Sequence, residues 1–530
     1  MEKIVSLCKR RGFVFQSSEI YGGLNGCWDY GPLGVELKRN LKDYWWRVMV
    51  RERDDIVGMD GAILQNRAVW KASGHEETFT DPMVDCRTCK ARLRADQLPQ
   101  KEGVPYCSVC GSRDLTEARA FNLMFVTYVG ATQDESSKTY LRPETAQAIF
   151  VQFKNVLEVS RKKLPFGIAQ IGKAFRNEIN PRNFTFRSRE FEQMELEYFC
   201  APEQGRELLE YWLKERLRFY ENIGLPREKL HVHEIPADER AFYSQGTYDL
   251  EYEFPFGVQE LEGIAHRGNY DLKQHQEHSG KPLEYFCAPE QGRELLEYWL
   301  KERLRFYENI GLPREKLHVH EIPAEERAFY SQGTYDIEFE FPFGIQELEG
   351  VAYRTDYDLT QHIKASGKPL DYFDEETKQR FIPHVVEPSA GVDRTALALI
   401  CSAYDEETVT DEKGKTETRI VLRFHPRIAP VKAGIFPLLK NNEHLVAKAK
   451  EITALLRPHM MIFYDESGAI GRRYRRQDEI GTPFGITVDF ETLGEKGDEL
   501  KDTVTLRHRD SMKQERVAIK DLLGIILPQL

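Results

Sequence analysis

Arginine, glutamate and phenylalanine side chains gather in two neighbouring segments, residues 176–178 and 186–195. The first reads Arg-Asn-Glu and the second reads Phe-Arg-Ser-Arg-Glu-Phe-Glu-Gln-Met-Glu. We expect a strand in which Arg187, Arg189 and Phe191 share one face, because side chains alternate along a strand. Guanidinium groups match phosphate in charge and geometry, and an aromatic ring can stack on a base. The pattern favours a nucleotide site; the alternative is a solvated charged strand with a phenylalanine in the core.

Four of the nine cysteines form two Cys-x-x-Cys pairs. Cys86 and Cys89 are separated from Cys107 and Cys110 by 17 residues. Four thiolates on two tight turns can complete a tetrahedral Zn²⁺ site, and such a set leaves no coordination position open for a substrate. The spacing therefore predicts a structural zinc site. The alternative is an insert whose cysteines are free or bridged.

A basic run, Arg-Arg-Tyr-Arg-Arg, occupies residues 472–476. Four guanidinium groups and one ring suit phosphates and an unstacked base, although a solvated charged face is the alternative. Residues 425–530 carry 17 Lys and Arg against 15 Asp and Glu, whereas the rest of the chain carries 57 against 71. This asymmetry predicts that the C-terminal region contacts a polyanion.

The elements that position these residues belong to a chain of 530 residues, which is too long for one compact domain. At ~150 residues per domain, three or four are expected. Hydrophobic residues make up 41% and charged residues 30%, so the chain can bury sizeable cores. No run approaches the ~18 apolar residues of a membrane span, and the first residues lack the apolar core of a signal peptide. We expect a cytoplasmic protein without a membrane partner.

A coarse reading of periodicity gives mixed elements. Residues 166–178 and 184–199 are predicted as two strands joined by a polar loop, and 385–391 as a strand that leads into a helix. Residues 404–419 are polar and acidic, and we predict a linker over 404–424. Strand and helix then alternate over 425–530, which indicates a separate α/β domain.

The largest feature is an internal repeat of 87 residues. Residues 197–283 align without a gap with 284–370, and 75 of the 87 positions are identical. Each copy predicts a helix followed by a hairpin. Two copies are too few for a solenoid, so part of one domain is duplicated. Because 12 differences leave the two cores nearly interchangeable, both hairpins can take the same place in a sheet and their energies compete.

These segments resemble class II aminoacyl-tRNA synthetases. Residues 176–195 are similar to motif 2 of that class, and Gly391-Val392-Asp393-Arg394 is similar to motif 3. Residues 142–147, Arg-Pro-Glu-Thr-Ala-Gln, resemble the strand entry that precedes motif 2. Within the class, the chain resembles glycyl-tRNA synthetases of the homodimeric type. The segments that carry this closer resemblance are 21–32, 347–359, 387–391 and, in the anticodon-binding domain, 472–483.

The resemblance implies an α+β fold. An antiparallel sheet core flanked by helices would carry a small zinc-ribbon-like insert and a C-terminal α/β anticodon-binding domain. Motif 1 would lie between about Gly34 and Ile63, at a homodimer interface. The implied divisions are 1–80 with motif 1, 81–120 for the insert, 121–403 for the catalytic core with both repeats, 404–424 for the linker and 425–530 for the anticodon-binding domain.

The resemblance also implies an activity. The family activates glycine with ATP and Mg²⁺ to glycyl-adenylate, then transfers glycine to the 3′ end of its tRNA. Arg176 and Arg394 would be catalytic: Arg176 holds the α-phosphate, while Arg394 covers the adenine and reaches the γ-phosphate. Glu347 would be a carboxylate ligand of Mg²⁺. The other implied ATP-binding residues are Asn177, Glu178, Phe186, Arg187, Ser188, Arg189, Glu190, Phe191, Leu348, Gly391, Val392 and Asp393.

Glycine has no side chain, so its pocket must bind the ammonium group and exclude anything larger. For each glutamate of the implied pocket, the alternative is a surface charge. The implied glycine-binding residues are Arg94, Glu144, Phe191, Glu192, Gln193, Met194, Glu195, Glu349, Glu387, Pro388, Ser389, Ala390 and Gly391. The implied tRNA-binding residues are Arg472, Arg473, Arg475 and Arg476. The expected partners are ATP, glycine, tRNA(Gly) and a second copy of the chain, but not DNA.

The chain departs from the family in having two helix–hairpin units where the family has one. Copy 2 carries Arg354-Thr355-Asp356, and copy 1 carries Arg267-Gly268-Asn269. We expect copy 2 in the catalytic sheet and copy 1 as an appended unit with an exposed apolar helix face. Three functions follow: an active glycine–tRNA ligase, an ATP- and tRNA-binding protein inactivated by the duplication, or a ligase for another small amino acid.

Overall fold

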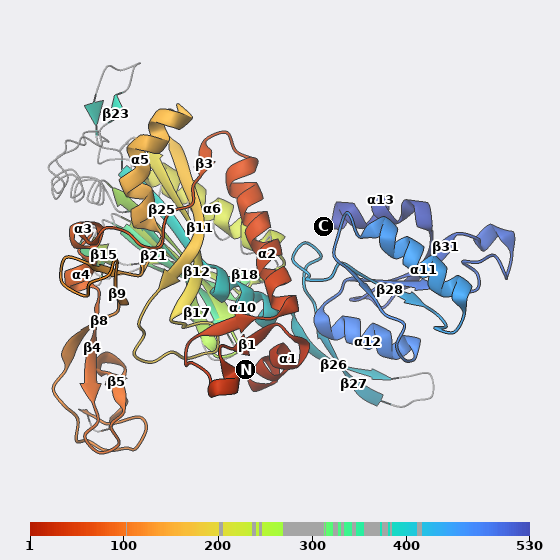
Figure 1. The fold of residues 1–530 in the computed structure, drawn as a ribbon, viewed down its shortest axis with the longest axis horizontal. Coiled ribbons are helices and arrows are strands. Elements are labelled where there is room, and N and C mark those ends of the chain that lie inside the picture. The colour runs from red at the N-terminus through yellow and green to blue at the C-terminus, as the bar shows by residue number, and fades with distance from the viewer. Residues whose placement is uncertain are drawn as a thin grey trace.

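The computed structural model describes residues 1–101, 103–200, 205–235, 240–242, 246–268, 312, 314–321, 327–329, 333–341, 346–353, 372–373, 380–381, 384–410 and 416–530. The larger hydrophobic core is built from the N-terminal and central parts of the chain, and a second core is built from residues 433–526. Figure 1 shows two lobes with β26 (Tyr404–Thr410) and β27 (Thr416–Leu422) between them. Among the described residues, no helix is both long and apolar enough to span a membrane.

The larger lobe is organised around a mostly antiparallel sheet. β11 (Phe166–Phe175) pairs along its whole length with β12 (Glu190–Cys200), in antiparallel orientation. The other edge of β12 pairs with β25 (His384–Gly391), and β3 (Ile56–Gly58) runs parallel to β11. Helices cover the sheet, so the predicted α+β class is confirmed.

The two faces of this sheet are covered by different helices. Met194, Leu196 and Tyr198 of β12 are buried in the large core, which also holds α2 (Pro32–Trp46) and α10 (Val392–Ala403). The odd-numbered neighbour Phe199 packs in a separate cluster with α5 (Ala146–Ser160), together with Phe166 and Ile168. This division follows from the alternation of side chains along a strand.

Copy 1 of the repeat is part of the larger lobe. Its helix α6 (Gly205–Asn222) buries Leu209, Trp212 and Tyr220, and its hairpin β16 (Gly246–Phe254) and β17 (Gly257–Gly268) lies in the sheet. The expectation that copy 1 has an exposed apolar helix face is therefore wrong. The physical reason is continuity, because β12 leads directly into copy 1 and the apolar stripe of α6 packs where the chain emerges.

The corresponding strand of copy 2, β22 (Gln346–Tyr353), has the same place in the sheet as β17. Glu262 of β17 and its equivalent Glu349 of β22 are both paired with Ala390 of β25. A strand has two edges, and β12 already pairs with Ala390 through Met194. The two repeats are therefore alternative occupants of the remaining edge. The helix of copy 2 and residues 354–371 lie outside the described part of the chain.

A small module projects from the larger lobe. β4 (Thr80–Asp85) pairs with both β5 (Arg92–Arg94) and β8 (Arg119–Asn122), and Figure 1 shows it at the lower left. Its own hydrophobic cluster surrounds Cys86 and Cys107.

The segment predicted as a linker, 404–424, is a β hairpin for most of its length. β26 and β27 pair from Tyr404↔Leu422 to Thr410↔Thr416. The segment connects the two lobes, but it is an ordered hairpin whose polar residues have partners in both of them. Lys3 of the N-terminal helix contacts Glu406, and Arg419 of β27 reaches the C-terminal lobe.

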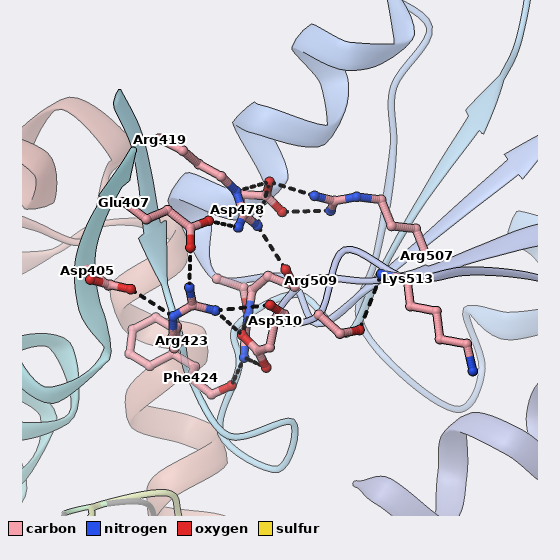
Figure 2. A network of polar contacts seen from close by, with 12 residues as sticks. Asp405, Glu407, Arg419, Arg423, Phe424, Asp478, Arg507, Arg509, Asp510 and Lys513 are labelled. Carbon is pink, nitrogen blue, oxygen red and sulfur yellow. Dashed lines mark hydrogen bonds and ion pairs between the residues drawn. The ribbon is translucent and has the colours of Figure 1, made fainter. Parts of the chain in front are cut away.

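Figure 2 shows the polar network between this hairpin and the C-terminal lobe. Asp478 accepts hydrogen bonds from Arg419 Nε at 2.9 Å and from Arg507 Nη1 at 2.9 Å. Arg423 extends the network to Asp510, at 3.1 Å. Asp405, Glu407 and Arg509 complete a set of four arginines and four carboxylates, so the charges balance. Breaking such a buried pair costs about 3–5 kcal/mol, so this network orients the two lobes.

The C-terminal lobe has the α/β architecture that the sequence predicts. β28 (Ala433–Pro437), β29 (Ile462–Tyr464) and β30 (Phe484–Val488) are parallel, and β31 (Thr503–His508) and β32 (Gln514–Ala518) continue the sheet in antiparallel orientation. Helices α11 (Glu443–Leu456) and α12 (Ile470–Ile480) complete the lobe. α12 carries the basic run.

Candidate functional site

The segment similar to motif 2 places its residues in two different settings. The second strand begins at Glu190, so Arg187 and Arg189 lie in the loop before it and do not share a strand face with Phe191. This corrects the predicted strand over 184–199. The loop turns through Asn183 and Phe184, both at positive φ, and buries Phe186 beneath it.

Arg176 lies between two aromatic rings. Its guanidinium carbon is 5.3 Å from the ring centre of Phe79 and 5.3 Å from that of Phe191. Its Nε donates to the carbonyl of Pro143 at 3.1 Å, directly before Glu144. The rings and this hydrogen bond fix the orientation of the guanidinium beside the start of α5.

The loop arginines have different partners. Arg187 Nε is 3.3 Å from the buried Glu178 carboxylate, and burial lowers the pKa of Arg187. Arg189 donates to the carbonyls of Asn25 and Glu178, at 2.6 and 3.0 Å, so it braces the loop. Ser188 donates to the Thr185 carbonyl within the loop. Asn177 is held through its backbone N–H by Leu123, and Glu190 pairs with Lys173 at 2.6 Å.

The segment similar to motif 3 follows the adjacent strand. β25 ends at Gly391, α10 begins at Val392, and the Arg394 guanidinium lies 4.8 Å from the centre of the Phe186 ring. Arg394 Nη1 is 3.4 Å from Glu260 Oε2. Glu260 belongs to copy 1 and is the equivalent of Glu347, whose side chain lies outside the described residues, as does that of Leu348.

Two of the predicted glycine-binding carboxylates lie at the start of α5. Glu144 accepts a hydrogen bond from Gln147 Nε2 at 2.9 Å, and one of its oxygens is 3.3 Å from His75 Nε2. Glu195 of β12 accepts a hydrogen bond from the Thr145 hydroxyl. Glu195 is buried and Glu144 is nearly so, and Arg176 contacts the adjoining main chain.

Glu192 does not join these carboxylates. It is three residues from Glu195, so the two point to opposite faces of β12. Its carboxylate pairs with Lys38 at 2.6 Å and with Lys42 at 2.9 Å, on the face covered by α2. The implied glycine-binding role of Glu192 is therefore wrong. Burial acts to raise its pKa, but the two lysines outweigh burial and hold the pKa at about 2.

The remaining predicted glycine-binding residues are divided between side chains and backbone. Gln193, Met194 and Ala390 are buried. Ser389 pairs through its backbone with Glu195, and Gly391 pairs with Gln193, so this part of β25 lies beside β12. The side chains of Glu349, Glu387, Pro388 and Ser389 lie outside the described residues. Arg94 pairs with Asp81 and Asp96, at 2.8 and 2.7 Å.

The four predicted zinc ligands lie together in the small module. Their sulfur atoms are all within 4.8 Å of one another, with Cys86–Cys110 and Cys89–Cys107 Sγ distances of 3.6 Å. A tetrahedron with Zn–S distances of about 2.3 Å has S···S edges of about 3.8 Å, so the donors fit the ion. The two turns match as well: Lys90 and Gly111, each four residues after a first cysteine, have positive φ. Backbone N–H groups lower the pKa of Cys86 to about 6.

The side chains of the basic run lie on different faces of α12. Arg473 is 2% exposed and donates to the carbonyls of Pro437, Glu466 and Gly468. Its predicted role in tRNA binding is wrong, because these hydrogen bonds make it part of the domain core. Arg476 is bound to Asp465, Arg475 pairs with Glu417 of the hairpin, and Arg472 is exposed. The Tyr474 hydroxyl contacts Thr487, so its ring packs inside the domain.

Sequence reasoning did not identify three residues of the site. Phe79 and His75 precede the cysteine module, and Lys38 lies on α2, all far from motif 2 in the chain. Of the three, Lys38 alone carried a signal in the sequence. It is a lysine on the apolar face of an amphipathic helix, where a buried charge requires a partner.

Comparison with known proteins places this geometry in a class. The family model for the tRNA synthetase class II core domain (G, H, P, S and T) matches residues 128–271, and the anticodon-binding domain model matches residues 432–529. The chain therefore has the core of a class II tRNA synthetase and its anticodon-binding domain.

Curated relatives define the family within that class. The chain is 45% identical to the glycine–tRNA ligase of Treponema denticola, over 100% of this chain and 97% of the relative. It is 44% identical to those of Thermobifida fusca, over 98% and 96%, and Clostridium perfringens, over 99% and 97%. The chain belongs to the glycine–tRNA ligase family.

Proposed function

We propose that the chain is a glycine–tRNA ligase that activates glycine with ATP and transfers it to tRNA(Gly). The observation that carries the proposal is that Arg176 binds the main chain directly before Glu144, and that Thr145, the next residue, donates to Glu195. Arg176 is held between Phe79 and Phe191, and its Nε contacts the main chain next to Glu144. A guanidinium at one end and two carboxylates at the other match the carboxylate and ammonium groups of an amino acid.

In the first step, a carboxylate oxygen of glycine forms a bond to the α-phosphorus of ATP. The bond from that phosphorus to the bridging oxygen breaks, and pyrophosphate leaves with the charge. Arg176 and Arg394 neutralise charge that grows on the phosphates, and Phe191 offers a ring to the adenine. In the second step, the terminal ribose hydroxyl of tRNA attacks the glycyl carbonyl, loses its proton, and AMP departs.

Mg²⁺ would neutralise phosphate charge when bound with ATP. Glu260, or its equivalent Glu347 when copy 2 is in the sheet, is the carboxylate beside Arg394 and fits the oxygen donors that Mg²⁺ prefers. Selection of glycine would rest on a small neighbour: Gly391 pairs with Gln193, on the face of β12 that carries Glu195. A pocket closed by such a residue excludes a larger substrate.

The test is glycine-dependent ATP–pyrophosphate exchange. We expect exchange with glycine and none with alanine or serine. Arg176→Ala and Arg394→Ala should each lower the exchange rate by about 10²–10³-fold, the effect of removing one transition-state donor. Arg39→Ala, at an exposed position of α2, is the matched control and should keep the wild-type rate. Near-normal exchange in either site variant would contradict its assigned role.

We also propose structural Zn²⁺ at Cys86, Cys89, Cys107 and Cys110, because the sulfur positions fit a tetrahedron. Protein purified under reducing conditions should hold one Zn²⁺ per chain, measured by metal analysis. Cys89→Ser should lose the metal, whereas Cys27→Ser should not, because Cys27 lies outside the cluster. A metal-free wild-type protein with four titratable thiols would contradict this proposal. The homodimer and the cytoplasmic location remain predictions of the sequence.

A second candidate function is an ATP- and tRNA-binding protein without ligase activity. It is favoured by one observation, the pairing of β17 and β22 with the same residues of β25. If the displaced repeat kept glycine out of the site, the wild-type chain would bind ATP but would not exchange pyrophosphate. The exchange assay therefore separates the two candidates.

A further inference from the structure

A buried lysine joins the segments similar to motifs 2 and 3. Lys38 lies on α2 and is 6% exposed. Its ammonium nitrogen is 2.6 Å from Glu192 Oε2 and 2.8 Å from Asp393 Oδ1, and it lies 4.1 Å from the centre of the Tyr30 ring. The ammonium thus connects α2, β12 and the first turn of α10.

The two carboxylates are themselves connected through the main chain. Asp393 Oδ2 accepts a hydrogen bond from the backbone N–H of Glu192 at 2.7 Å. The carboxylate of Asp393 therefore binds Lys38 with one oxygen and the main chain of β12 with the other. This arrangement fixes the start of α10 against the start of β12.

Each of these carboxylates is adjacent in sequence to a residue of the proposed ATP site. Glu192 follows Phe191, whose side chain points to the opposite face of β12 and contacts Arg176. Asp393 precedes Arg394, whose guanidinium lies over Phe186. A displacement of Glu192 or Asp393 therefore moves a ring or a guanidinium of the proposed ATP site.

The charge on Lys38 is retained despite burial. Burial acts to lower the pKa of Lys38, but Asp393 and Glu192 outweigh it, so the pKa is raised. Without the ammonium, Asp393 and Glu192 would face each other as two buried carboxylates, and Lys42 pairs with Glu192 alone among the described residues. Repulsion would separate β12 from α10.

We propose that Lys38 is a positioning residue for adenylate formation, which sets the distance between Phe191 and Arg394 through Glu192 and Asp393. The inference rests on the proposed ligase function. Lys38 contacts neither ATP nor glycine and acts through the two carboxylates. Lys42 provides a matched control because it lies one turn along α2 and pairs with Glu192, but has no ion pair with Asp393 among the described residues.

The test compares Lys38→Met with Lys42→Met in the full-length chain. Lys38→Met should lower the maximal exchange rate by about 100-fold, as expected when reacting groups move by about 1 Å. The KM for ATP should rise and the KM for glycine should stay within about twofold, because Glu144 and Glu195 lie on the other face of the sheet. Lys42→Met should stay near wild type, and Lys38→Arg should recover most of the rate because it restores the charge.

Circular dichroism at the assay temperature checks that each variant is folded. Should Lys38→Met fail to fold, Asp393→Asn keeps the shape of the side chain and one oxygen for the Glu192 N–H, but turns an uncharged amide group toward Lys38. It should give the same split between rate and KM. Equal losses in Lys38→Met and Lys42→Met, or wild-type kinetics in Lys38→Met, would overturn the inference. Calorimetric ATP binding separates the two proposals. If wild-type protein binds ATP without exchange, the ligase function fails, whereas weaker ATP binding by Lys38→Met alone still supports the positioning role.

Discussion

Glu192 and Glu195 illustrate how one strand assigns different chemistry to the same amino acid. Glu195 faces α5 and accepts a hydrogen bond from Thr145, while Glu192 faces α2 and pairs with two lysines. Both are glutamates of the segment similar to motif 2, and both were implied to bind glycine. Their odd spacing on β12 was enough to show that only one of them can do so.

The environment of Glu192 makes the free energy of unfolding depend on pH. Its pKa is about 2 in the folded protein and about 4.5 when unfolded. Between pH 2 and pH 4.5 the folded state therefore binds fewer protons than the unfolded state. Its contribution is complete above pH 4.5 and is lost as the pH falls toward 2. We expect the stability difference between wild type and Glu192→Gln to be about 1 kcal/mol smaller at pH 4 than at pH 7.

Urea unfolding at the two pH values measures this difference. Glu190→Gln is the control, because Glu190 is an exposed residue of the same strand, and its effect should change little with pH. A difference between wild type and Glu192→Gln that stays constant from pH 7 to pH 4 would contradict the low pKa.

Local patterns predicted many of these residues but few of their partners. Arg176, Glu178 and Arg394 were found because the segments that contain them are short and distinctive. Phe79, His75 and Lys38 come from distant parts of the chain, and their roles exist only once α2 and β12 are packed together. Periodicity assigns a residue to a face, but it does not say which residue of another element lies opposite.

The helix α12 shows the same limit at the level of an element. Its five-residue basic run was predicted as one surface, but a helix turns each successive side chain by about 100°, so the run cannot share one face. Arg473 points into the domain and Arg472 points outward. Similarly, the polar composition of residues 404–424 predicted a linker, whereas the polar groups form the hairpin network of Figure 2.

This division predicts different effects for neighbouring arginines. Arg472→Ala and Arg475→Ala should each weaken tRNA binding and reduce its salt dependence by about one unit of slope, if each contacts one phosphate. Arg473→Ala should instead lower the free energy of unfolding by about 3 kcal/mol, because several buried carbonyls lose their donor.

Filter binding across a salt series and urea unfolding measure the two effects. Pyrophosphate exchange is the control and should be unchanged in Arg472→Ala, because α12 lies in the other lobe from Arg176. A salt slope that changes for Arg473→Ala but not for Arg472→Ala would reverse the assignment.

At the scale of the whole molecule, the duplication determines how many arrangements the larger lobe has. β25 has one edge for two strands, and Glu262 and Glu349 have the same partner, Ala390. With 12 differences in 87 positions, the free energies of the two arrangements are close.

Deleting either repeat should therefore simplify the fold. Removal of 284–370 keeps α6, β16 and β17 in place. Removal of 197–283 also preserves the end of β12, because residues 284–287 repeat the sequence of 197–200.

Each shortened chain should unfold in one sharper transition, with a midpoint raised by about 2–4 °C for each kcal/mol gained in the free energy of unfolding. Scanning calorimetry on the three chains measures this, and exchange rates then compare the two hairpins. A shortened chain that is insoluble while the full chain folds would contradict the interpretation.

Because two strands can occupy one edge of β25, the chain carries a spare copy of that strand. A substitution that weakens β17 does not simply open the sheet; it shifts occupancy to β22, about tenfold for each 1.4 kcal/mol. A substitution in one repeat therefore leaves the other repeat able to complete the sheet. The sheet is lost only when both equivalent positions, such as Glu262 and Glu349, are changed. Each repeat is thereby sheltered from purifying selection for as long as the other remains intact, so inherited errors can accumulate in one copy without loss of the sheet.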